Sequence, residues 1–354
     1  MLVTAESGPQ ESRVASSGGV TGAAAVVRSA SAEILRILGD LIPAKSQCAL
    51  VDFPNYPNVG DSAIWLGQRA FLKSVDAKIA YCCDLNTYSQ SQMRKMIDGE
   101  SIIVMQGGGN FGDIWHHHQR FREQVIRDFP NHRIVIFPHS ILFKSADTLA
   151  QARQVIDGHG AVTILARDQR SLALARRSFA SRSVLCPDMA FFLGTLRAPR
   201  RPSCEIVWLA RTDAESLGYP LPPVTASLRH ANWLQEGKWF SEARETLTGE
   251  SGCLRQWWHQ SYGPLLLAYD FLARMRVSYG LKLLSAGRCV ITDMLHGFVL
   301  SLLMERPTVL LDNNYGKVND YYSTWIKDCA RTAWADSPEQ ALELAERFLQ
   351  TDNR

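Results

Sequence analysis

The sequence predicts an α/β fold of two Rossmann-like domains, because apolar strand-like runs alternate with segments of helical periodicity. Its 354 residues exceed the length at which one hydrophobic core usually stops growing, so two domains are expected. The apolar runs are continuous rather than alternating, which is typical of parallel strands covered by helices on both faces. We therefore expect parallel sheets with right-handed crossovers between successive strands.

Six short apolar runs, most of them rich in β-branched residues, predict the strands of the first domain. They are residues 49–53, 79–83, 102–105, 134–137, 162–165 and 183–185. Between these runs the apolar residues recur with helical spacing. That spacing predicts helices at 62–73, 90–97, 114–129, 146–156 and 168–179.

The second domain resumes this alternation after a break in composition. Residues 197–203 (RAPRRPS) lack apolar periodicity and indicate a linker. Strands are predicted at 205–210, 289–292 and 308–311, and helices at 265–285, 295–304 and 338–350, whereas 212–262 shows no clear pattern. The predicted units are a disordered tail (1–30), an N-terminal domain on the acceptor side (31–196) and a C-terminal domain on the donor side (204–354).

Composition and charge argue against several classes of protein. The net charge is only +3 and no run of Lys and Arg occurs, so no nucleic-acid partner is expected. The eight cysteines include no CxxC pair, which favours reduced thiols in a cytoplasmic enzyme. No secretion signal and no apolar stretch long enough to span a membrane is evident, so the protein is expected to be soluble.

In an open parallel sheet, ligands bind in the loops that follow the carboxyl ends of the strands. The first unusual loop is 55–62 (NYPNVGDS). Gly60 is expected to turn the chain with a positive φ, which places Asp61 at a helix N-terminus. Asp61 is then either a helix cap or a base that accepts a proton from a sugar hydroxyl.

The second loop, 106–115 (QGGGNFGDIW), is rich in glycine. Gly107, Gly108 and Gly109 would expose backbone amides to a ligand, and a helix starting near Asp113 would add its positive end. No Lys follows the glycines and their spacing is not GxGxxG, so neither ATP nor a nicotinamide cofactor is indicated. A close helix–sheet contact is the alternative, but Asn110, Asp113 and Trp115 favour a binding loop.

Charged or ionisable residues mark four further strand ends. Arg167 (in ARDQRS) and Arg211 (in RTD) carry planar guanidinium groups suited to carboxylate or phosphate, with a surface ion pair as the alternative. His296 (in TDMLHG) is expected at a helix start as a general acid or phosphate donor, although a lone histidine is usually structural. Lys317 (in DNNYGK) lies where it would neutralise an anion.

Three adjacent histidines at 116–118 do not indicate a metal site. Neighbouring residues on a helix point in different directions and cannot bind one ion together, so they are more often solvated or in a supporting role. No metal site is therefore predicted.

Taken in order, these motifs resemble the polysaccharide pyruvyltransferase family. The resemblance rests on NVGD (58–61), QGGGNFGDIW (106–115), FPHS (137–140), ARD (166–168), PDMAF (187–191), TDMLHG (292–297) and LDNNYGK (311–317), and covers about 49–325. It implies a fold similar to the GT-B glycosyltransferases, with the site in the cleft between the domains. It also implies phosphoenolpyruvate as co-substrate, a pyruvate ketal as product and no cofactor. The acceptor would be a sugar of an exopolysaccharide or of its lipid-linked precursor, which places the enzyme in the cytoplasm, peripherally associated with the inner face of the membrane.

The resemblance also suggests roles for individual residues. Leu295 and His296 match the donor-binding Leu-His pair, whereas Met294 stands where the family has a donor-binding Arg. Arg167, Arg211 and Lys317 are candidates to supply that charge, together with the glycines and Asn110, and a different donor is the alternative. Asp61 or Asp113 would take the hydroxyl protons, and Asn58 and Trp115 would contact the acceptor.

Two other functions fit the same features. A GT-B glycosyltransferase that uses a nucleotide sugar would share the fold and would not need the missing Arg. A non-catalytic sugar-binding subunit of a polysaccharide assembly complex would also explain Met294, but the set of His296, Asp61, Arg167 and Lys317 favours an enzyme.

Overall fold

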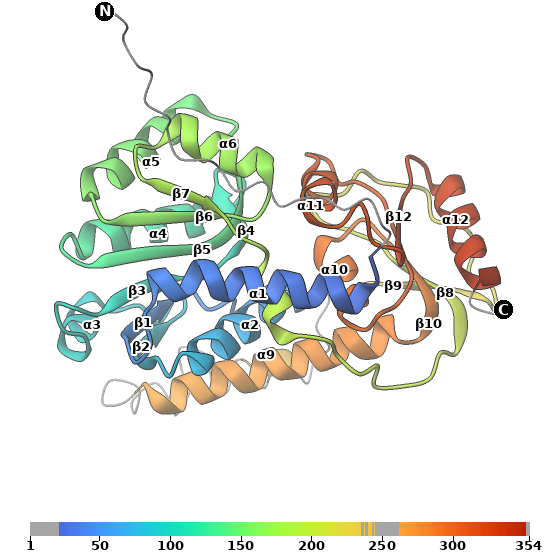
Figure 1. The fold of residues 1–354 in the computed structure, drawn as a ribbon, viewed down its shortest axis with the longest axis horizontal. Coiled ribbons are helices and arrows are strands. Elements are labelled where there is room, and N and C mark those ends of the chain that lie inside the picture. Colours follow the sequence, from blue (N-terminus) through green and yellow to red (C-terminus); the bar gives the residue numbers. More distant parts are fainter. Residues whose placement is uncertain (1–20, 235–236, 238–239, 243, 245–261, 352–354) are drawn as a thin grey trace, which may run out of the picture.

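The computed structural model of the protein describes residues 21–234, 237, 240–242, 244 and 262–351, and it contains two parallel sheets side by side (Figure 1). The first sheet has seven strands in the order β2-β1-β3-β5-β6-β7, with β4 paired to β5. The second has five strands in the order β12-β11-β10-β8-β9. Helices cover both sheets, so the predicted α/β class with two Rossmann-like halves is confirmed.

The elements of the first half have the following bounds. The strands are β1 Gln47–Val51, β2 Lys78–Cys83, β3 Ile102–Met105, β4 Gly108–Gly112, β5 Arg133–Leu142, β6 Val162–Ala166 and β7 Arg182–Leu185. The helices are α1 Ala23–Leu41, α2 Val59–Ser74, α3 Gln90–Met96, α4 His116–Asp128, α5 Ala146–His159, α6 Gln169–Ser178 and the short 3-10 helix η1 Met189–Leu193. Every strand and helix predicted here is present, with ends shifted by a few residues.

The second half begins after residues 194–203, which contain no helix or strand. Its strands are β8 Cys204–Leu209, β9 Leu228–Ala231, β10 Gly287–Thr292, β11 Thr308–Leu310 and β12 Thr332–Trp334. Its helices are α9 Gly263–Leu284, α10 Leu295–Leu303, α11 Lys317–Trp325 and α12 Pro338–Thr351. The predicted helix start at Pro338 is confirmed, and the Ser337 hydroxyl accepts a hydrogen bond from the Gln340 amide at 3.2 Å.

The glycine-rich segment forms a strand, not the binding loop that the sequence predicts. β4 pairs in parallel with β5, with Gly108 opposite His139 and Gly112 opposite Leu142. As a result, α4 starts at His116 rather than near Asp113. Local composition does not reveal β4 because its hydrogen-bonding partner lies about 30 residues away in sequence.

Helix α1 replaces part of the predicted tail. The prediction of disorder through residue 30 is wrong from Ala23 onward, and residues 1–20 lie outside the described part of the chain. Val27, Ile34 and Leu38 repeat with helical spacing and are buried, so one face of α1 packs against η1 and α10. Figure 1 shows α1 lying across both halves.

Helix α9 also joins the halves, although it follows the predicted domain boundary. The Tyr269 ring stacks on Phe53 of the first half, with centroids 3.9 Å apart. Asp270 accepts hydrogen bonds from Trp65 and Arg69 of α2 at 2.8 and 3.0 Å. The other end of α9 packs against β8 and β10. The predicted boundary at 204 therefore does not separate two independent cores, and one apolar cluster runs through both halves.

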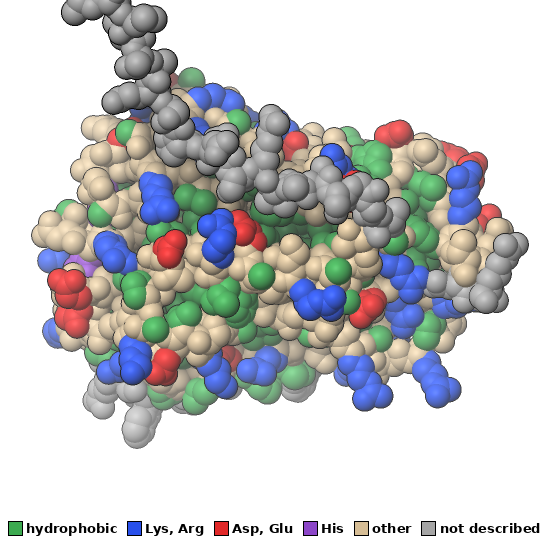
Figure 2. Space-filling view, viewed as in Figure 1, with side chains coloured by type: hydrophobic (Ala, Val, Ile, Leu, Met, Phe, Trp, Pro, Cys, Tyr) green, Lys and Arg blue, Asp and Glu red, His purple; other side chains and the backbone are tan. Residues whose placement is uncertain are grey.

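The surface carries no single basic region on the side drawn in Figure 2, where Lys and Arg side chains are spread out with Asp and Glu between them. Among the described residues, no helix is both long enough and apolar enough to cross a bilayer.

Candidate active site

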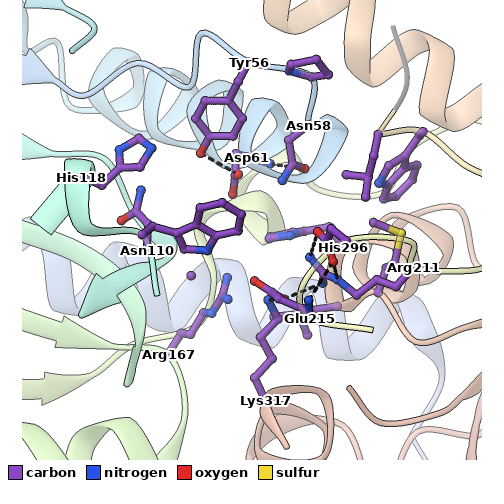
Figure 3. Close-up of a pocket in the computed structure, with 18 of the residues that line it drawn as sticks. Tyr56, Asn58, Asp61, Asn110, His118, Arg167, Arg211, Glu215, His296 and Lys317 are labelled. Atoms are coloured by element: carbon purple, nitrogen blue, oxygen red, sulfur yellow. Dashed lines mark hydrogen bonds and ion pairs between the residues drawn. The ribbon is translucent and has the colours of Figure 1, made fainter. Parts of the chain in front are cut away.

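A cavity of about 350 Å³ lies between the two halves, at the carboxyl ends of both sheets (Figure 3). The segments after β1, β3 and β6 form one side, and those after β8, β10 and β11 form the other. We call this cavity the reaction cleft. Ten of the predicted site residues line it: Asn58, Asp61, Gly109, Asn110, Trp115, Arg167, Arg211, Leu295, His296 and Lys317.

His296 sits in the first turn of α10, as predicted, and packs directly against α2. A Cβ atom on Gly60 would lie only 2.4 Å from Nδ1 of His296. The predicted reason for this glycine is wrong, because Gly60 is helical and its φ is not positive. Glycine is required there because the imidazole of the opposite half occupies the space of a side chain.

Asp188 connects His296 to Arg167. Oδ2 of Asp188 accepts a hydrogen bond from Nη1 of Arg167 at 2.7 Å and lies 3.3 Å from Nε2 of His296. Burial alone would raise the pKa of Asp188, but His296 and Arg167 outweigh burial and hold that pKa below its usual value. The carboxylate is therefore ionised and orients both side chains.

Two cations converge on the backbone of β4. A Cβ atom on Gly109 would lie 3.4 Å from Nη2 of Arg167 and 3.5 Å from Nζ of Lys317. Arg167 uses Nη1 and Nε for Asp188 and Ser140, whereas Nη2 has no hydrogen-bond partner among the described residues. This edge of the cleft thus combines bare backbone with two positive groups from different halves, which suits an anion.

Glu215 lies on the second-half side of the cleft and pairs with two cations (Figure 3). Its Oε2 atom accepts from Nη1 of Arg211 at 2.8 Å and contacts Nζ of Lys317. Arg211 is held further by Asp213, at 2.7 and 2.9 Å. Burial lowers the pKa of Lys317 to about 8, and Glu215 offsets only part of that effect. Lys317 is therefore a cation that can lose its charge near neutral pH.

Asp61 faces the cleft from the first turn of α2. The Tyr56 hydroxyl donates to Oδ2 of Asp61 at 2.9 Å. Burial, together with the neighbouring Asp61 and Asp52, raises the pKa of Tyr56, so the phenol keeps its proton. Asn58, not Asp61, is the N-cap of α2, and its Oδ1 atom accepts from the Gly60 amide at 2.8 Å. Asp61 is thus free of the capping role that was the alternative for it.

Asp113 does not line the reaction cleft, and we revise its predicted role as a base. Its carboxylate accepts hydrogen bonds from the amides of Lys144 and Ser145 at 2.7–2.8 Å, just before α5. Gly107 and Gly108 do not line the reaction cleft either. Gly107 packs against the Pro138 carbonyl, and Gly108 packs against Asp61. Within β4, Gly109 and Asn110 line the cleft whereas Gly108 does not, and Gly107 and Asp113 lie just outside the two ends of this strand.

Asn110 reaches the cleft but also belongs to a buried network. Its Oδ1 atom accepts from Arg122 at 2.8 Å and lies 3.0 Å from Nε2 of His139. Burial, together with the nearby Arg122, lowers the pKa of His139 well below its usual value, so this imidazole is neutral. The network fixes the position of Asn110 at the cleft wall.

The three adjacent histidines differ in burial, and the rings of His117 and His118 lie with their centroids 4.5 Å apart. His116 and His117 are exposed, whereas His118 is buried with Nδ1 2.9 Å from the Asp52 carboxylate. Among the described residues, no group of three His, Cys, Asp or Glu side chains has the arrangement of a metal site. His117 and His118 nevertheless line the reaction cleft.

Met294 lies in the cleft at the N-cap position of α10, next to Leu295 and His296. Arg211 and Lys317 line the same cavity from neighbouring loops, and Arg167 lines it from the opposite half. Positive charge therefore reaches the cleft without an arginine at this position.

Sequence reasoning did not select several residues of the site. Asp188 follows strand β7, so the rule that ligands bind at strand ends would have selected it. Glu215 and Trp233 fall in the region where the sequence shows no periodicity, and nothing local indicates that they face the cleft.

The fold and the cleft together define a class of protein: an α/β enzyme of two Rossmann-like halves with a cleft rich in cations between them. A histidine, three cations and at least one carboxylate converge there from separate strand ends.

Comparison with known proteins is consistent with this class and defines it further. The family model for polysaccharide pyruvyl transferase matches residues 58–233. EpsO of Bacillus subtilis (strain 168), named as a candidate pyruvyl transferase, is 30% identical over 306 residues, which cover 83% of this chain and 89% of that protein. Pyruvyl transferase 1 of Schizosaccharomyces pombe (strain 972 / ATCC 24843) is 30% identical over 310 residues, which cover 84% of this chain and 74% of that protein.

A solved structure supports the fold alone. A functionally uncharacterized protein of Klebsiella pneumoniae subsp. pneumoniae NTUH-K2044 aligns with a TM-score of 0.57 at 17% identity, covering 86% of this chain and 97% of that one. From the sequence relationships, this chain belongs to the polysaccharide pyruvyl transferase family and is a transferase.

Proposed function

We propose that this enzyme transfers the pyruvyl group of phosphoenolpyruvate to two hydroxyls of one sugar, forming a pyruvate ketal and releasing phosphate. The sugar belongs to an exopolysaccharide or to its lipid-linked precursor. Phosphoenolpyruvate is a metabolite of the cell interior, so the proposal places the enzyme in the cytoplasm, at the inner membrane face when the acceptor is lipid-linked. Besides this co-substrate, the scheme needs no cofactor and no metal.

The observation that carries the proposal is that Arg167 and Lys317 meet at the bare backbone of Gly109, in the same cavity that His296 lines. Phosphoenolpyruvate carries both a carboxylate and a phosphate, so it needs several cations and oriented N–H groups. The cleft of about 350 Å³ lies near the lower end of the range for small-molecule sites, which suits a three-carbon donor beside one sugar ring.

The chemistry assigns a proton donor and a proton acceptor. His296, held beside Asp188, gives a proton to C3 of the donor while the first sugar hydroxyl adds to C2. Asp61 accepts the proton of that hydroxyl. Phosphate then leaves the tetrahedral C2, and the second hydroxyl adds to the resulting oxocarbenium centre and loses its proton. The C2=C3 π bond and the C2–O bond to phosphate break, while one C3–H bond and two C2–O bonds form. The proton of the second hydroxyl leaves with phosphate, and the proton taken by Asp61 returns through solvent to His296.

The test uses purified full-length protein, phosphoenolpyruvate and fragments of the exopolysaccharide from which pyruvate has been removed by mild acid. We expect phosphate release and a pyruvate-sized mass increase of the fragment. His296→Ala is expected to abolish both while the far-UV circular dichroism spectrum stays unchanged. Undiminished turnover by that variant would remove His296 from the mechanism.

Thermal shift separates this proposal from a nucleotide-sugar glycosyltransferase, since a ligand that binds the native state raises the unfolding midpoint. A shift with phosphoenolpyruvate and none with a panel of nucleotide sugars is expected. The reverse pattern would overturn the choice of donor.

A further inference from the structure

A second cavity of about 370 Å³ adjoins the reaction cleft. Its lining includes Asn58, Trp233, Phe240, Met275, Tyr279 and Lys282. Asn58 and Trp233 line the reaction cleft as well, so these two side chains form the partition between the cavities. No step of the proposed reaction uses this second space.

Three structural elements build the second cavity. Met275, Ser278, Tyr279 and Lys282 are spaced three and four residues apart along α9 and therefore share one helix face. The N-terminus of α2 and the segment around Trp233 close the other sides. Trp233 is only 2% exposed, and a Cβ atom on Gly280 would lie 3.2 Å from its indole ring and 2.4 Å from Val59. The partition is thus held in place by close packing against α9.

The lining combines aromatic faces with hydrogen-bonding groups. Phe240 and Tyr279 offer apolar aromatic surface, which matches the C–H face of a sugar ring, and the buried Trp233 supports the wall behind them. The side-chain oxygen of Asn58 accepts the hydrogen bonds that cap α2, whereas its amide nitrogen has no partner among the described residues. Ser278 and Lys282 add further donors. A hydrocarbon chain would leave these groups without partners, so the lining favours a saccharide over a lipid tail.

We propose that the second cavity binds the sugar unit next to the one that receives the pyruvyl group. The proposal rests on the saccharide acceptor of the proposed function. The acceptor chain passes Asn58, with its reacting unit beside His296 and its neighbouring unit against Tyr279. The enzyme accordingly recognises at least two linked sugars and prefers an oligosaccharide to a free monosaccharide.

The test measures binding by isothermal titration calorimetry, independently of turnover. The probes are fragments of the pyruvate-free exopolysaccharide, separated into one-unit and two-unit sizes. We expect the wild-type protein to bind two-unit fragments about tenfold more tightly. Tyr279→Ala removes an aromatic face from a side chain that is 44% exposed, and Ser278→Trp fills the cavity. Both variants are expected to reduce the preference to about twofold or less.

Leu267→Ala is the matched control. Leu267 lies on the same helix, is 70% exposed and is not part of the cavity lining, so the variant should keep the full preference. Equal affinity for the two sizes, a preference that survives Ser278→Trp, or binding of neither size would overturn the proposal. A preference that depends on an attached lipid and not on the second sugar would also overturn it.

Phosphate release from phosphoenolpyruvate, measured in parallel, distinguishes this proposal from the function on which it rests. Preferential binding of two-unit fragments without phosphate release would support the second-sugar subsite and contradict phosphoenolpyruvate as the donor. Phosphate release without any preference for fragment length would support the donor and contradict the second-sugar subsite.

Discussion

Single side chains determine the charge of the reaction cleft. Asp188 is fully buried and shares one oxygen between Arg167 and His296. Glu215 similarly joins Arg211 to Lys317. Arg167, Arg211 and Lys317 are therefore each paired with a carboxylate. The Asp188 group and the Glu215 group can be tested separately.

Asp188→Asn is expected to impair binding and chemistry together, because it releases both Arg167 and His296. The KM for phosphoenolpyruvate should rise and kcat should fall, whereas Arg167→Lys should affect mainly KM. Loss of a partner from a buried ion pair should also lower the free energy of unfolding by about 3 kcal/mol or more, measurable by urea denaturation. Normal kcat in the folded Asp188→Asn protein would contradict the positioning role.

Lys317 gives the reaction a defined dependence on pH. Its pKa is lowered by burial to about 8, so the side chain is charged below that pH and neutral above it. Binding of an anionic donor needs the charged form, and kcat/KM reports the free enzyme. We expect kcat/KM for phosphoenolpyruvate to fall as the pH rises through about 8.

Lys317→Arg provides the comparison, since arginine keeps its charge throughout this range. The descending limb of the profile should move to higher pH in that variant, even if the maximum is lower. An identical limb in both proteins would mean that Lys317 is not the titrating group.

At the scale of elements, the site depends on the contact between the N-terminal turns of α2 and α10. One turn carries Asp61 and the other carries His296, and they approach so closely that only glycine fits at position 60. The catalytic groups from the two halves are therefore placed by helix packing rather than by loops.

Gly60→Ala should push the His296 ring out of place and lower kcat by about 100-fold, as expected when a catalytic group is displaced by about 1 Å. It should also destabilise the fold by about 1–3 kcal/mol through overpacking. Gly39→Ala in α1 is the control, because a Cβ atom there has nothing within 4 Å and should be neutral or slightly stabilising. Kinetics and thermal melts of the two variants give the comparison, and full activity of Gly60→Ala would refute the tight contact.

At the scale of the whole molecule, α1 and α9 join the two halves into one core. The aromatic stack of Tyr269 on Phe53 and the Asp270 hydrogen bonds attach α9 to the first half, and α1 reaches α10 of the second. The cleft thus lies between sheets that share much of their stabilising apolar contact.

We expect a single cooperative unfolding transition for both halves, although proteins of this size often unfold domain by domain. Differential scanning calorimetry should give equal calorimetric and van't Hoff enthalpies. Two resolved transitions would show that the helices do not couple the halves.

The sequence alone predicted two parallel sheets and most of the helices, although not β4, β9, β12 or α11, and it selected ten residues that line the cleft. Buried parallel strands are continuous apolar runs and helices repeat every 3.6 residues, so both patterns are local. The rule that ligands bind at strand ends then selected Asp61, Arg167, Arg211, His296 and Lys317, all of which line the cleft.

The tertiary structure decided what depends on distant partners. Pairing with β5 turned the glycine-rich segment into a strand, and the Asp113 carboxylate binds the amides of Lys144 and Ser145 outside the cleft. Packing between the halves explains why residue 60 must be glycine. It also brings Asp188 close to His296, which lies 108 residues away in the sequence. These outcomes are contacts between segments far apart in sequence, and no local pattern encodes which of them will meet.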